Sequence, residues 1–310
     1  MKFESYKTLF VVNPRSAGGK TERAWKTLAP IAAEYVKDHD SKMTQWSGHA
    51  TELARAALKS GYEMIVSVGG DGTNNEVING FFENGKPVRK DAIFATIPRG
   101  TGCDFARGMK ISRKPVDAFR RLAGKKTTPL DIGRIDYADG AKKGTRYFVN
   151  IAGFGANGDV VARVNRSGKR LGGFATFLTA TVASLATFKN PTVGLSFDGE
   201  EEQVSKINVV FVCNAQYCGG GMMAGPKAVV DDGMFDVTVI GDMSKTEALL
   251  SGRLLYSGKI YDHPKVRHIR ARTLTARALD GDVLVEADGE QPGLLPATYS
   301  ILPSAIQFKI

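Results

Sequence analysis

A glycine-rich segment built around one acidic residue is the most chemically informative part of the sequence. It reads Gly69-Gly-Asp-Gly-Thr73 and lies between a continuous apolar run and a segment with helical spacing. Glycines there let the backbone approach a phosphate closely, and the N-terminus of a helix supplies free N–H groups and a positive dipole. The segment therefore predicts a phosphate-binding loop between a strand and a helix.

The same segment has a structural alternative. Thr73 and Glu76 have the spacing of a helix-capping box, and Asp71 could bond its own backbone in a turn. A turn does not need three glycines around one acid, so we favour the phosphate loop. It is neither a Walker A loop nor the GxGxxG pattern of dinucleotide-binding folds.

Two further loops have a similar composition. Asn13–Lys20 follows the first apolar run of the chain and Arg99–Gly102 follows the fourth; both contain Gly, Ser or Thr, and basic residues. The carboxyl ends of parallel strands meet at one edge of a sheet, which is where open α/β sheets bind ligands. The three loops together predict a nucleotide-binding cradle.

Two acidic turns occur late in the chain. Asp288-Gly-Glu290 follows a strand-like run, and a carboxylate there could accept the proton of a substrate hydroxyl, although Asp-Gly is also an ordinary hairpin turn. Asp231-Asp-Gly233 has a spacing that suits a metal site and a metal-free turn about equally.

The elements that must position these loops change character near residues 127–129. In the first part, strand-like runs alternate with helical segments, which predicts a doubly wound, mostly parallel α/β domain over residues 1–128. Its expected strands are 8–12, 42–45, 63–68 and 92–97, and its expected helices are 21–36, 51–58 and 74–82. Residues 129–310 predict a mainly antiparallel β-rich domain, with the return of the last strand to the first domain as an open alternative. The strands expected there are 146–151, 192–197, 204–213, 234–240, 273–276 and 283–286, with helices near 171–188 and 245–256.

The motifs, in this order, resemble those of the diacylglycerol kinase catalytic domain family, which includes bacterial soluble lipid kinases, sphingosine kinases and ceramide kinases. The resemblance covers essentially the whole chain. It rests on the three loops, the third of them read as Pro98–Ala106, and on Asp131–Gly133, Asn150–Gly155, Asp232–Phe235 and Asp288–Glu290. One departure is Cys103, where the family often has asparagine.

The resemblance implies that ATP phosphorylates a hydroxyl of a diacylglycerol-like or sphingoid lipid, in a cleft between a nucleotide-binding and a lipid-binding domain. A carboxylate among phosphates is repulsive without a cation, so we expect Asp71 to hold ATP-bound Mg²⁺. We expect Asp288 to act as the base, with Glu290 as a close alternative. A structural Mg²⁺ is implied at the Asp232 carboxylate and the backbone carbonyls of Val229 and Met234. The residues implied to bind ATP are Asn13, Pro14, Arg15, Ser16, Ala17, Thr44, Gly69, Gly70, Asp71, Gly72, Thr73, Asn74, Asn75 and Thr101.

The composition of the 310 residues, 43% hydrophobic and 24% charged, excludes a disordered, collagenous or coiled-coil chain. Three cysteines and the lack of a signal peptide or a 20-residue strongly apolar run lead us to expect a cytoplasmic protein. Lys and Arg number 42 against 32 Asp and Glu, without a nucleic-acid-binding motif. We therefore expect peripheral contact with an anionic membrane and no nucleic-acid partner. A homodimer stays open.

Two alternative functions remain at this point. An NAD kinase-like phosphotransferase could use the same Gly-Gly-Asp-Gly loop, although the Asn13 loop and the Asp288 turn resemble the lipid kinases more closely. A non-catalytic lipid-binding or regulatory module could share the fold, although it would not need Asp71, Asp232, Asp288 and Glu290 together.

Overall fold

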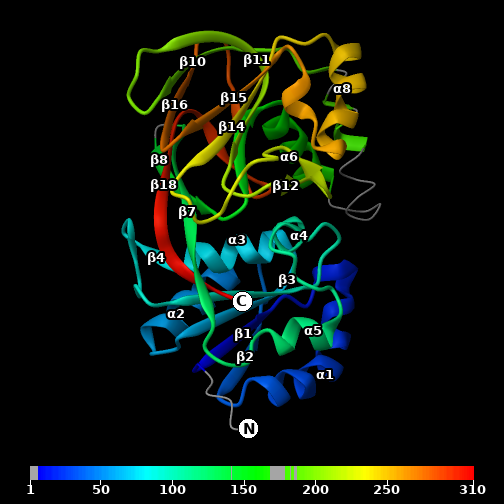
Figure 1. Cartoon of the computed structure of the whole chain (residues 1–310), viewed down its shortest axis with the longest axis vertical. Helices are drawn as coiled ribbons and strands as arrows, with labels where there is room; N and C mark the ends of the chain where they lie inside the picture. Colours follow the sequence, from blue (N-terminus) through cyan, green and yellow to red (C-terminus); the bar gives the residue numbers. More distant parts are fainter. Residues whose placement is uncertain (1–5, 141, 168–178, 182, 185–186) are drawn as a thin grey trace. The chain divides into compact units, whose positions relative to one another are not determined.

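The computed structural model describes residues 6–140, 142–167, 179–181, 183–184 and 187–310 (Figure 1). The chain divides into two compact units. Unit 1 comprises Met1–Asp131 and Ser304–Ile310, and unit 2 comprises Ile132–Pro303. The expected join after residue 128 falls within β7 (Thr127–Asp139), a strand that begins in unit 1 and continues into unit 2.

Unit 1 is built on a parallel sheet with the strand order β2-β1-β3-β6-β18. The three central strands are buried along their whole length, as their continuous apolar sequences predict. The last strand of the chain joins this sheet at its end, where Gln307 pairs with Ile93 of β6. The bounds are β1 (Thr8–Val12), β2 (His39–Met43), β3 (Met64–Gly69), β6 (Ile93–Pro98) and β18 (Glu290–Lys309).

Helices cover both faces of this sheet, which confirms the doubly wound α/β architecture. On one face, Phe10 of β1 packs against Trp25 of α1 and Phe119 of α5, with ring centroids 5.6 and 6.1 Å apart. On the other face, Phe94 of β6 meets Phe81, the residue that follows α3. The helices are α1 (Ser16–Tyr35), α2 (His49–Lys59), α3 (Asp71–Gly80), α4 (Asp104–Gly108) and α5 (Pro115–Arg120); β4 (Phe82–Glu83) and β5 (Lys86–Pro87) form a short hairpin.

Unit 2 is β-rich, and its described strand pairs are antiparallel, as expected for the second half of the chain. Its core is aromatic and aliphatic; Phe148 stacks on Phe235, and Phe154 packs on Tyr299. The strands not yet given are β8 (Lys142–Phe148), β9 (Ile151–Gly155), β10 (Thr192–Phe197), β11 (Gln203–Cys213), β12 (Tyr217–Cys218), β13 (Met222–Met223), β14 (Phe235–Gly241), β15 (Val266–Ala271), β16 (Thr273–Ala278) and β17 (Leu284–Ala287).

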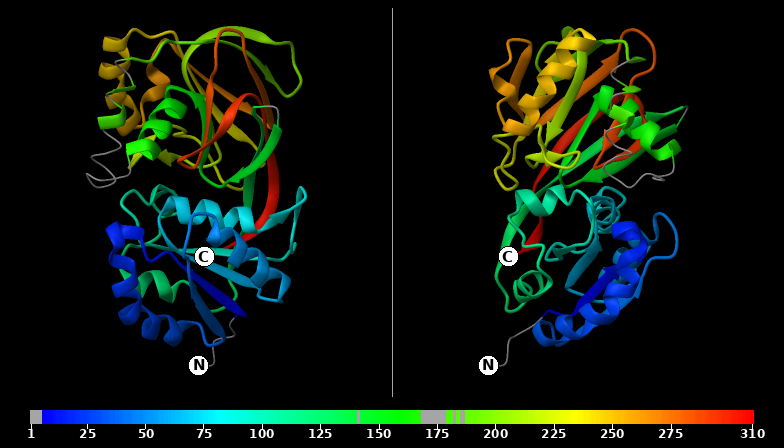
Figure 2. Two further views of the ribbon diagram at one scale, coloured as in Figure 1. Left: turned by 180° about the vertical axis from the view of Figure 1, so that it is seen from behind. Right: turned by 90° about the vertical axis from the view of Figure 1, so that its right-hand side faces the viewer.

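The helices of unit 2 lie outside its sheet (Figure 2). They are α6 (Ala156–Ser167), α8 (Lys245–Ser257) and the short 3₁₀ helix η1 (Ile260–Asp262). Of the expected helix at 171–188, residues 171–178 lie outside the described part, whereas residues 179–181, 183–184 and 187 are helical. Among the described residues, no helix is long and apolar enough to span a bilayer.

Candidate active site

The loops that follow β1, β3 and β6 meet at one edge of the unit 1 sheet. The side-chain amide of Asn13 donates a hydrogen bond to the hydroxyl of Thr73, with an N–O distance of 2.9 Å. Gly70 and Gly100 approach backbone to backbone, since a Cβ on Gly100 would lie 2.6 Å from the Cα of Gly70. Glycine is therefore required where the second and third loops touch.

The structural alternative, a capping box formed by Thr73 and Glu76, is wrong. Helix α3 begins at Asp71, and the Thr73 hydroxyl instead accepts the hydrogen bond from Asn13. The Glu76 carboxylate accepts the backbone N–H of Ala50, 3.1 Å away, at the start of α2. Thr73 and Glu76 thus form hydrogen bonds with residues of other segments instead of with each other's backbone. They connect elements of unit 1 and do not cap their own helix.

The first loop has an unusual backbone. Ala17, Gly18 and Gly19 follow one another in the left-handed region, with φ of 52°, 68° and 84°. Such a conformation is strained for Ala17, and strain of this kind concentrates at ligand-binding sites. The Ser16 hydroxyl donates to the carbonyl of Asn13 at 2.8 Å, and the side-chain oxygen of Asn13 accepts the N–H of Arg15 at 3.0 Å, which fixes the turn.

The remaining residues expected to bind the nucleotide differ in exposure. Thr44 lies beside the first loop, because its backbone N–H donates to the carbonyl of Val12 at 2.9 Å. Gly72 and Thr101 are exposed. Asn74 and Asn75 are buried, and the Asn74 side chain accepts a hydrogen bond from the Thr96 hydroxyl at 2.9 Å, so the geometry gives these two asparagines a supporting role behind the loop.

Asp71 connects the second loop to the third. Its carboxylate accepts the backbone N–H groups of Asp104 and Phe105, at 3.0 and 3.2 Å, in the first turn of α4. Burial raises the pKa of the Asp71 carboxyl, and the hydrogen bonds from the backbone oppose that rise. Asp71 is therefore largely shielded from solvent, and its carboxylate fixes the start of α4.

Two residues support the third loop in a way that the sequence did not predict. The Cys103 thiol, at a φ of 53°, accepts the N–H of Gly100, and burial raises the pKa of this thiol to about 11. The Arg113 guanidinium donates to the carbonyl of Gly100 at 2.6 Å. A basic residue ten or more positions after a glycine loop gives no periodic signal in a sequence, which is why Arg113 was not recognised.

In unit 2, Asp288 is held by three consecutive backbone N–H groups. Its carboxylate accepts those of Val149, Asn150 and Ile151, at 2.9, 3.1 and 3.1 Å. The expected single strand at 146–151 is therefore wrong: β8 ends at Phe148 and β9 begins at Ile151, because the N–H groups between them bind a carboxylate instead of a neighbouring strand.

Glu286, two residues before Asp288, is a buried acid that the sequence analysis did not single out. Its carboxyl group accepts the N–H of Gly289 at 2.8 Å and the side-chain amide of Asn157 at 3.2 Å. Burial, with a contribution from the neighbouring charge of Asp288, raises the pKa of Glu286 to about 8. Its position inside β17, directly after the continuous apolar residues Val283–Val285, was the one available signal. Glu290, at the other end of this turn, is exposed.

The residues of the expected structural Mg²⁺ site do not fit a resident metal ion. One oxygen of the Asp232 carboxylate accepts the N–H of Met234 at 3.0 Å, and the other is paired with the guanidinium of Arg270. The positive charge at Asp232 is thus supplied by Arg270, and Val229 is half-exposed nearby in the sequence.

Comparison with known protein families gives one match for the first part of the chain and another for the second part. Residues 7–135 match the diacylglycerol kinase catalytic domain, and residues 150–309, more than half of the chain, match the YegS C-terminal NAD kinase beta sandwich-like domain. The chain belongs to the family of diacylglycerol kinases and YegS-like lipid kinases. Family membership makes it a phosphotransferase.

Individual relatives are similar over most of their length. A diacylglycerol kinase of Staphylococcus carnosus is 28% identical over 264 residues, which cover 85% of this chain and 82% of that protein. The crystal structure of a diacylglycerol kinase from Bacillus anthracis matches with a TM-score of 0.73 and 21% identity, over 100% of this chain and 97% of that one. Yeast NADH kinase complexed with NADH matches with a TM-score of 0.54 and 10% identity, over 98% of this chain and 83% of that one. The two structural likenesses concern the fold alone.

Proposed function

We propose that this lipid kinase transfers the γ-phosphate of ATP to a hydroxyl group of a diacylglycerol-like or sphingoid lipid. The observation that carries the proposal is the meeting of three loops at the carboxyl edge of a parallel sheet, through the Asn13–Thr73 hydrogen bond and the Gly70–Gly100 contact. Phosphoryl transfer depends mainly on positioning and charge stabilisation, and backbone N–H groups around glycines provide both.

In this proposal, unit 1 binds the nucleotide. The exposed Gly72 and the left-handed backbone at Ala17 and Gly18 present N–H groups to the phosphates, while the buried asparagines hold the loop from behind. Asp71 is the residue that would hold nucleotide-bound Mg²⁺, because its carboxylate lies in the glycine-rich phosphate loop at the start of α3, and a carboxylate beside phosphates needs a cation. The cation would neutralise phosphate charge.

Unit 2 supplies the base, and the geometry favours Glu290 over Asp288. Both oxygens of Asp288 already accept backbone N–H groups, so this carboxylate orients the turn. Glu290 is exposed at the end of the same turn, where a substrate hydroxyl can reach it. That the phosphate passes between sites on the two units stays a prediction.

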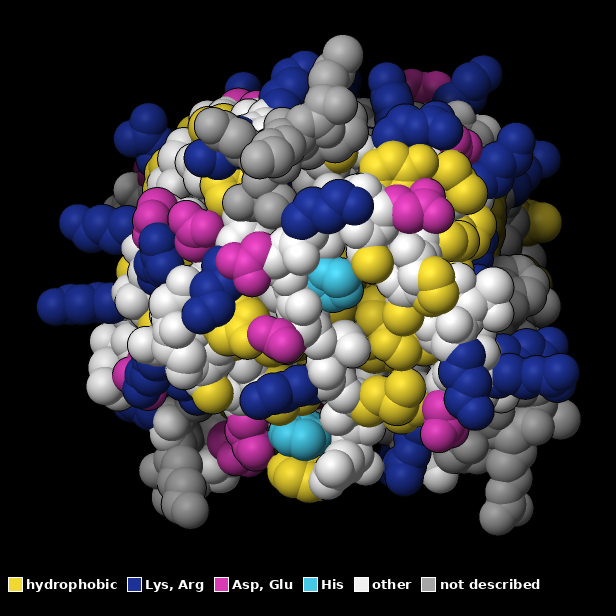
Figure 3. All heavy atoms as spheres, turned by 90° about the horizontal axis from the view of Figure 1, so that it is seen from below, with side chains coloured by type: hydrophobic (Ala, Val, Ile, Leu, Met, Phe, Trp, Pro, Cys, Tyr) yellow, Lys and Arg dark blue, Asp and Glu magenta, His cyan; other side chains and the backbone are white. Residues whose placement is uncertain are grey.

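The lipid substrate requires contact with a membrane, and we propose that this contact is peripheral and depends on anionic lipids. On the face shown in Figure 3, Lys and Arg side chains are interspersed with Asp and Glu side chains. The charge on that face is mixed, so the net positive charge of +10 is not collected there into one basic patch.

The test is phosphorylation of defined lipids in mixed micelles. The purified chain is incubated with γ-labelled ATP and Mg²⁺ and with diacylglycerol, monoacylglycerol, phosphatidylglycerol, sphingosine or ceramide, and NAD is offered in a parallel tube. Label in diacylglycerol or sphingosine supports the proposal. Label in NAD alone, or in none of these acceptors, contradicts it.

A further inference from the structure

Helix α8 of unit 2 carries three large, exposed apolar side chains. Leu249, Leu250 and Tyr256 are 59%, 64% and 51% exposed, and α8 contains no buried residue. With 3.6 residues per turn, Leu249 and Tyr256 lie on one side of the outward face and Leu250 on the other, with Arg253 between them. Isolated exposed leucines are ordinary, but two leucines and a tyrosine on one helical face form a patch.

The charge on this outward face has one sign. Arg253 and Lys245 are exposed there, and the acidic residue of the helix, Glu247, lies on the other side, where it pairs with Lys265 at 2.7 Å. The segment 253–277, which begins in α8, contains seven basic residues and one acidic residue, although Lys265, Arg270 and Arg277 are paired with acids from other segments. Leucine and aromatic side chains can enter the headgroup boundary of a bilayer, and basic side chains beside them attract anionic lipids.

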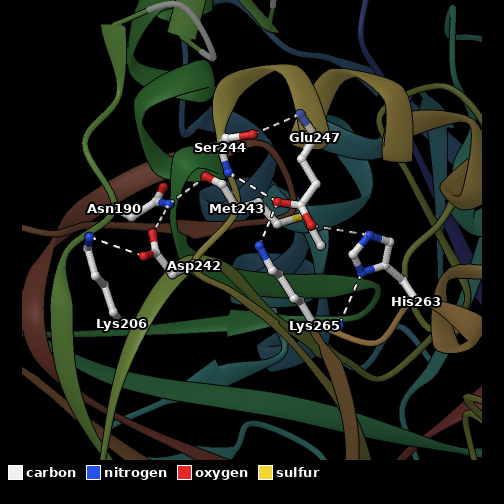
Figure 4. Close-up of polar contacts among 8 residues, drawn as sticks. All are labelled: Asn190, Lys206, Asp242, Met243, Ser244, Glu247, His263 and Lys265. Carbon is white, nitrogen blue, oxygen red and sulfur yellow. Dashed lines mark hydrogen bonds and ion pairs between the residues drawn. The ribbon is translucent and has the colours of Figure 1, made fainter.

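The start of α8 is firmly anchored, so this face is presented in a fixed orientation (Figure 4). The Ser244 side chain accepts the N–H of Glu247, and the Glu247 carboxylate accepts the N–H of Ser244 in return. The preceding residues are held by Asn190, whose side-chain amide donates to Asp242 at 2.7 Å and to the carbonyl of Met243 at 2.9 Å. Of these residues, Asn190, Asp242, Met243 and Ser244 border a half-open cavity of about 700 Å³, and their mutual pairing gives the cavity wall a structural role.

We propose that the outward face of α8 is the surface by which this kinase docks on an anionic lipid membrane, with Leu249 and Leu250 entering the interface and Arg253 and Lys245 contacting the headgroups. This inference rests on the proposed function, because a lipid substrate brings the chain to a membrane. It deepens that proposal by assigning the contact to one helix.

A second copy of the chain is a poorer occupant of this face. In a symmetric dimer the same patch meets itself, so the two Arg253 side chains and the two Lys245 side chains would bring like charges close together. An anionic lipid surface supplies the opposite charge and accepts leucine side chains at the same time.

The test compares vesicle binding by the unaltered chain, by the double variant Leu249→Ser/Leu250→Ser, and by the control Val204→Ser. Val204, on β11 of the same unit, is 63% exposed, so its substitution removes exposed apolar surface away from α8. Co-sedimentation is measured with vesicles of phosphatidylcholine alone and with added phosphatidylglycerol, without ATP or a lipid substrate. Binding is thus measured independently of phosphoryl transfer, and failure of one proposal is distinguishable from failure of the other.

The double variant is expected to bind the anionic vesicles about ten-fold more weakly or worse, whereas Val204→Ser binds as the unaltered chain does. Turnover of lipid in detergent micelles is expected to stay unchanged in the double variant, which shows that it folds. The proposal would be overturned if the double variant bound the vesicles as well as the unaltered chain, or if Val204→Ser lost as much vesicle binding as the double variant. It would also be overturned if the unaltered chain sedimented as a dimer and the double substitution made it monomeric.

Discussion

The Asp71 carboxylate accepts a hydrogen bond from the backbone N–H of Asp104, 3.0 Å away, so the acid of the glycine-rich loop also fixes the start of α4. Two loops that are 33 residues apart are thereby held in one arrangement. In the proposed function the same carboxylate also holds the cation that accompanies the phosphates, so we expect activity to be sensitive to small changes at this residue.

Replacing Asp71 by asparagine should therefore affect activity more than stability. The amide keeps one oxygen for the backbone N–H groups but loses the charge, so we expect ATP turnover to fall about 100-fold or more. The free energy of unfolding should fall by about 0.5–1 kcal/mol, since a negative charge near a helix N-terminus is lost. Steady-state kinetics and denaturant unfolding measure the two effects. The control is Asp91→Asn, which removes an exposed acid of the same unit; equal turnover in both variants would contradict the assignment.

The Asp288 turn predicts a division of roles between its two acids. In Asp288→Ala, the buried N–H groups of residues 149–151 lose their acceptor, and we expect the free energy of unfolding to fall by about 3 kcal/mol or more. Glu290→Gln changes an exposed residue and should leave stability within about 0.5 kcal/mol, while turnover falls about 100-fold or more. Unaffected turnover in Glu290→Gln would show that Glu290 is not the base.

Glu286 predicts a specific dependence of stability on pH. Its pKa is raised to about 8 in the folded chain, chiefly by burial, so the folded state keeps the proton that the unfolded state releases near pH 4.5. This proton stabilises the fold fully below pH 4.5, and the stabilisation is lost as the pH rises towards 8, with a slope approaching about 1.4 kcal/mol per pH unit.

The measurement for Glu286 is denaturant unfolding from pH 5 to pH 8.5, compared with Glu286→Gln. The amide resembles the protonated acid and does not titrate, so the difference in stability between the two proteins should shift in favour of the variant as the pH rises. A difference that stays constant over this range would mean that Glu286 is already ionised in the folded chain at pH 5.

Cys103 predicts the effect of restoring the residue that the resemblance suggests. Its φ of 53° lies in the left-handed region, which asparagine adopts more readily than cysteine and β-branched residues avoid. Cys103→Asn should therefore keep full activity and a melting temperature at least as high, whereas Cys103→Val should lose about 1–3 kcal/mol of stability. Thermal unfolding of both variants checks this. A destabilised Cys103→Asn would show that the contact of the thiol with the Gly100 N–H matters more than the backbone conformation.

The Asp232–Arg270 pair predicts that the fold does not depend on a structural metal ion. With the guanidinium supplying the positive charge, neither EDTA nor added Mg²⁺ should change the melting temperature in the absence of nucleotide. Arg270→Met should lower stability by only about 1 kcal/mol, because the pair is partly exposed. A melting temperature that rises markedly when Mg²⁺ alone is added would contradict this prediction and support a structural Mg²⁺ site at Asp232.

The sequence predicted those elements whose burial is uniform. β1 and β3 are apolar throughout and buried on both faces, so their sequences leave little choice. β2, with the sequence His-Asp-Ser-Lys-Met, lies at the sheet edge, and its pairing with β1 could not be read from apolar residues, which is why its expected position was shifted to 42–45. β15 is half-exposed and carries Arg267 and Arg270, and it was missed for the same reason.

The long strand β18, and the hydrogen bonds that hold the site together, could not be predicted from the sequence for other reasons. β18 contains Pro292, Pro296 and Pro303, which argue against a strand when only local preferences are considered. The candidate residues of the loops were found because glycine and acidic residues are rare in that combination. Their partners, such as Asn13 for Thr73 and residues 149–151 for Asp288, are distant in the sequence and became visible only in the folded chain.

The most direct test of the account is transfer of label from γ-labelled ATP to diacylglycerol in mixed micelles, measured for the unaltered chain and for Glu290→Gln at equal nucleotide occupancy. The account predicts labelled lipid with the unaltered chain and about 100-fold less with the variant, although both bind ATP equally well. Labelled lipid at the same rate in both would contradict the assigned base. The absence of labelled lipid with the unaltered chain would contradict diacylglycerol as its substrate.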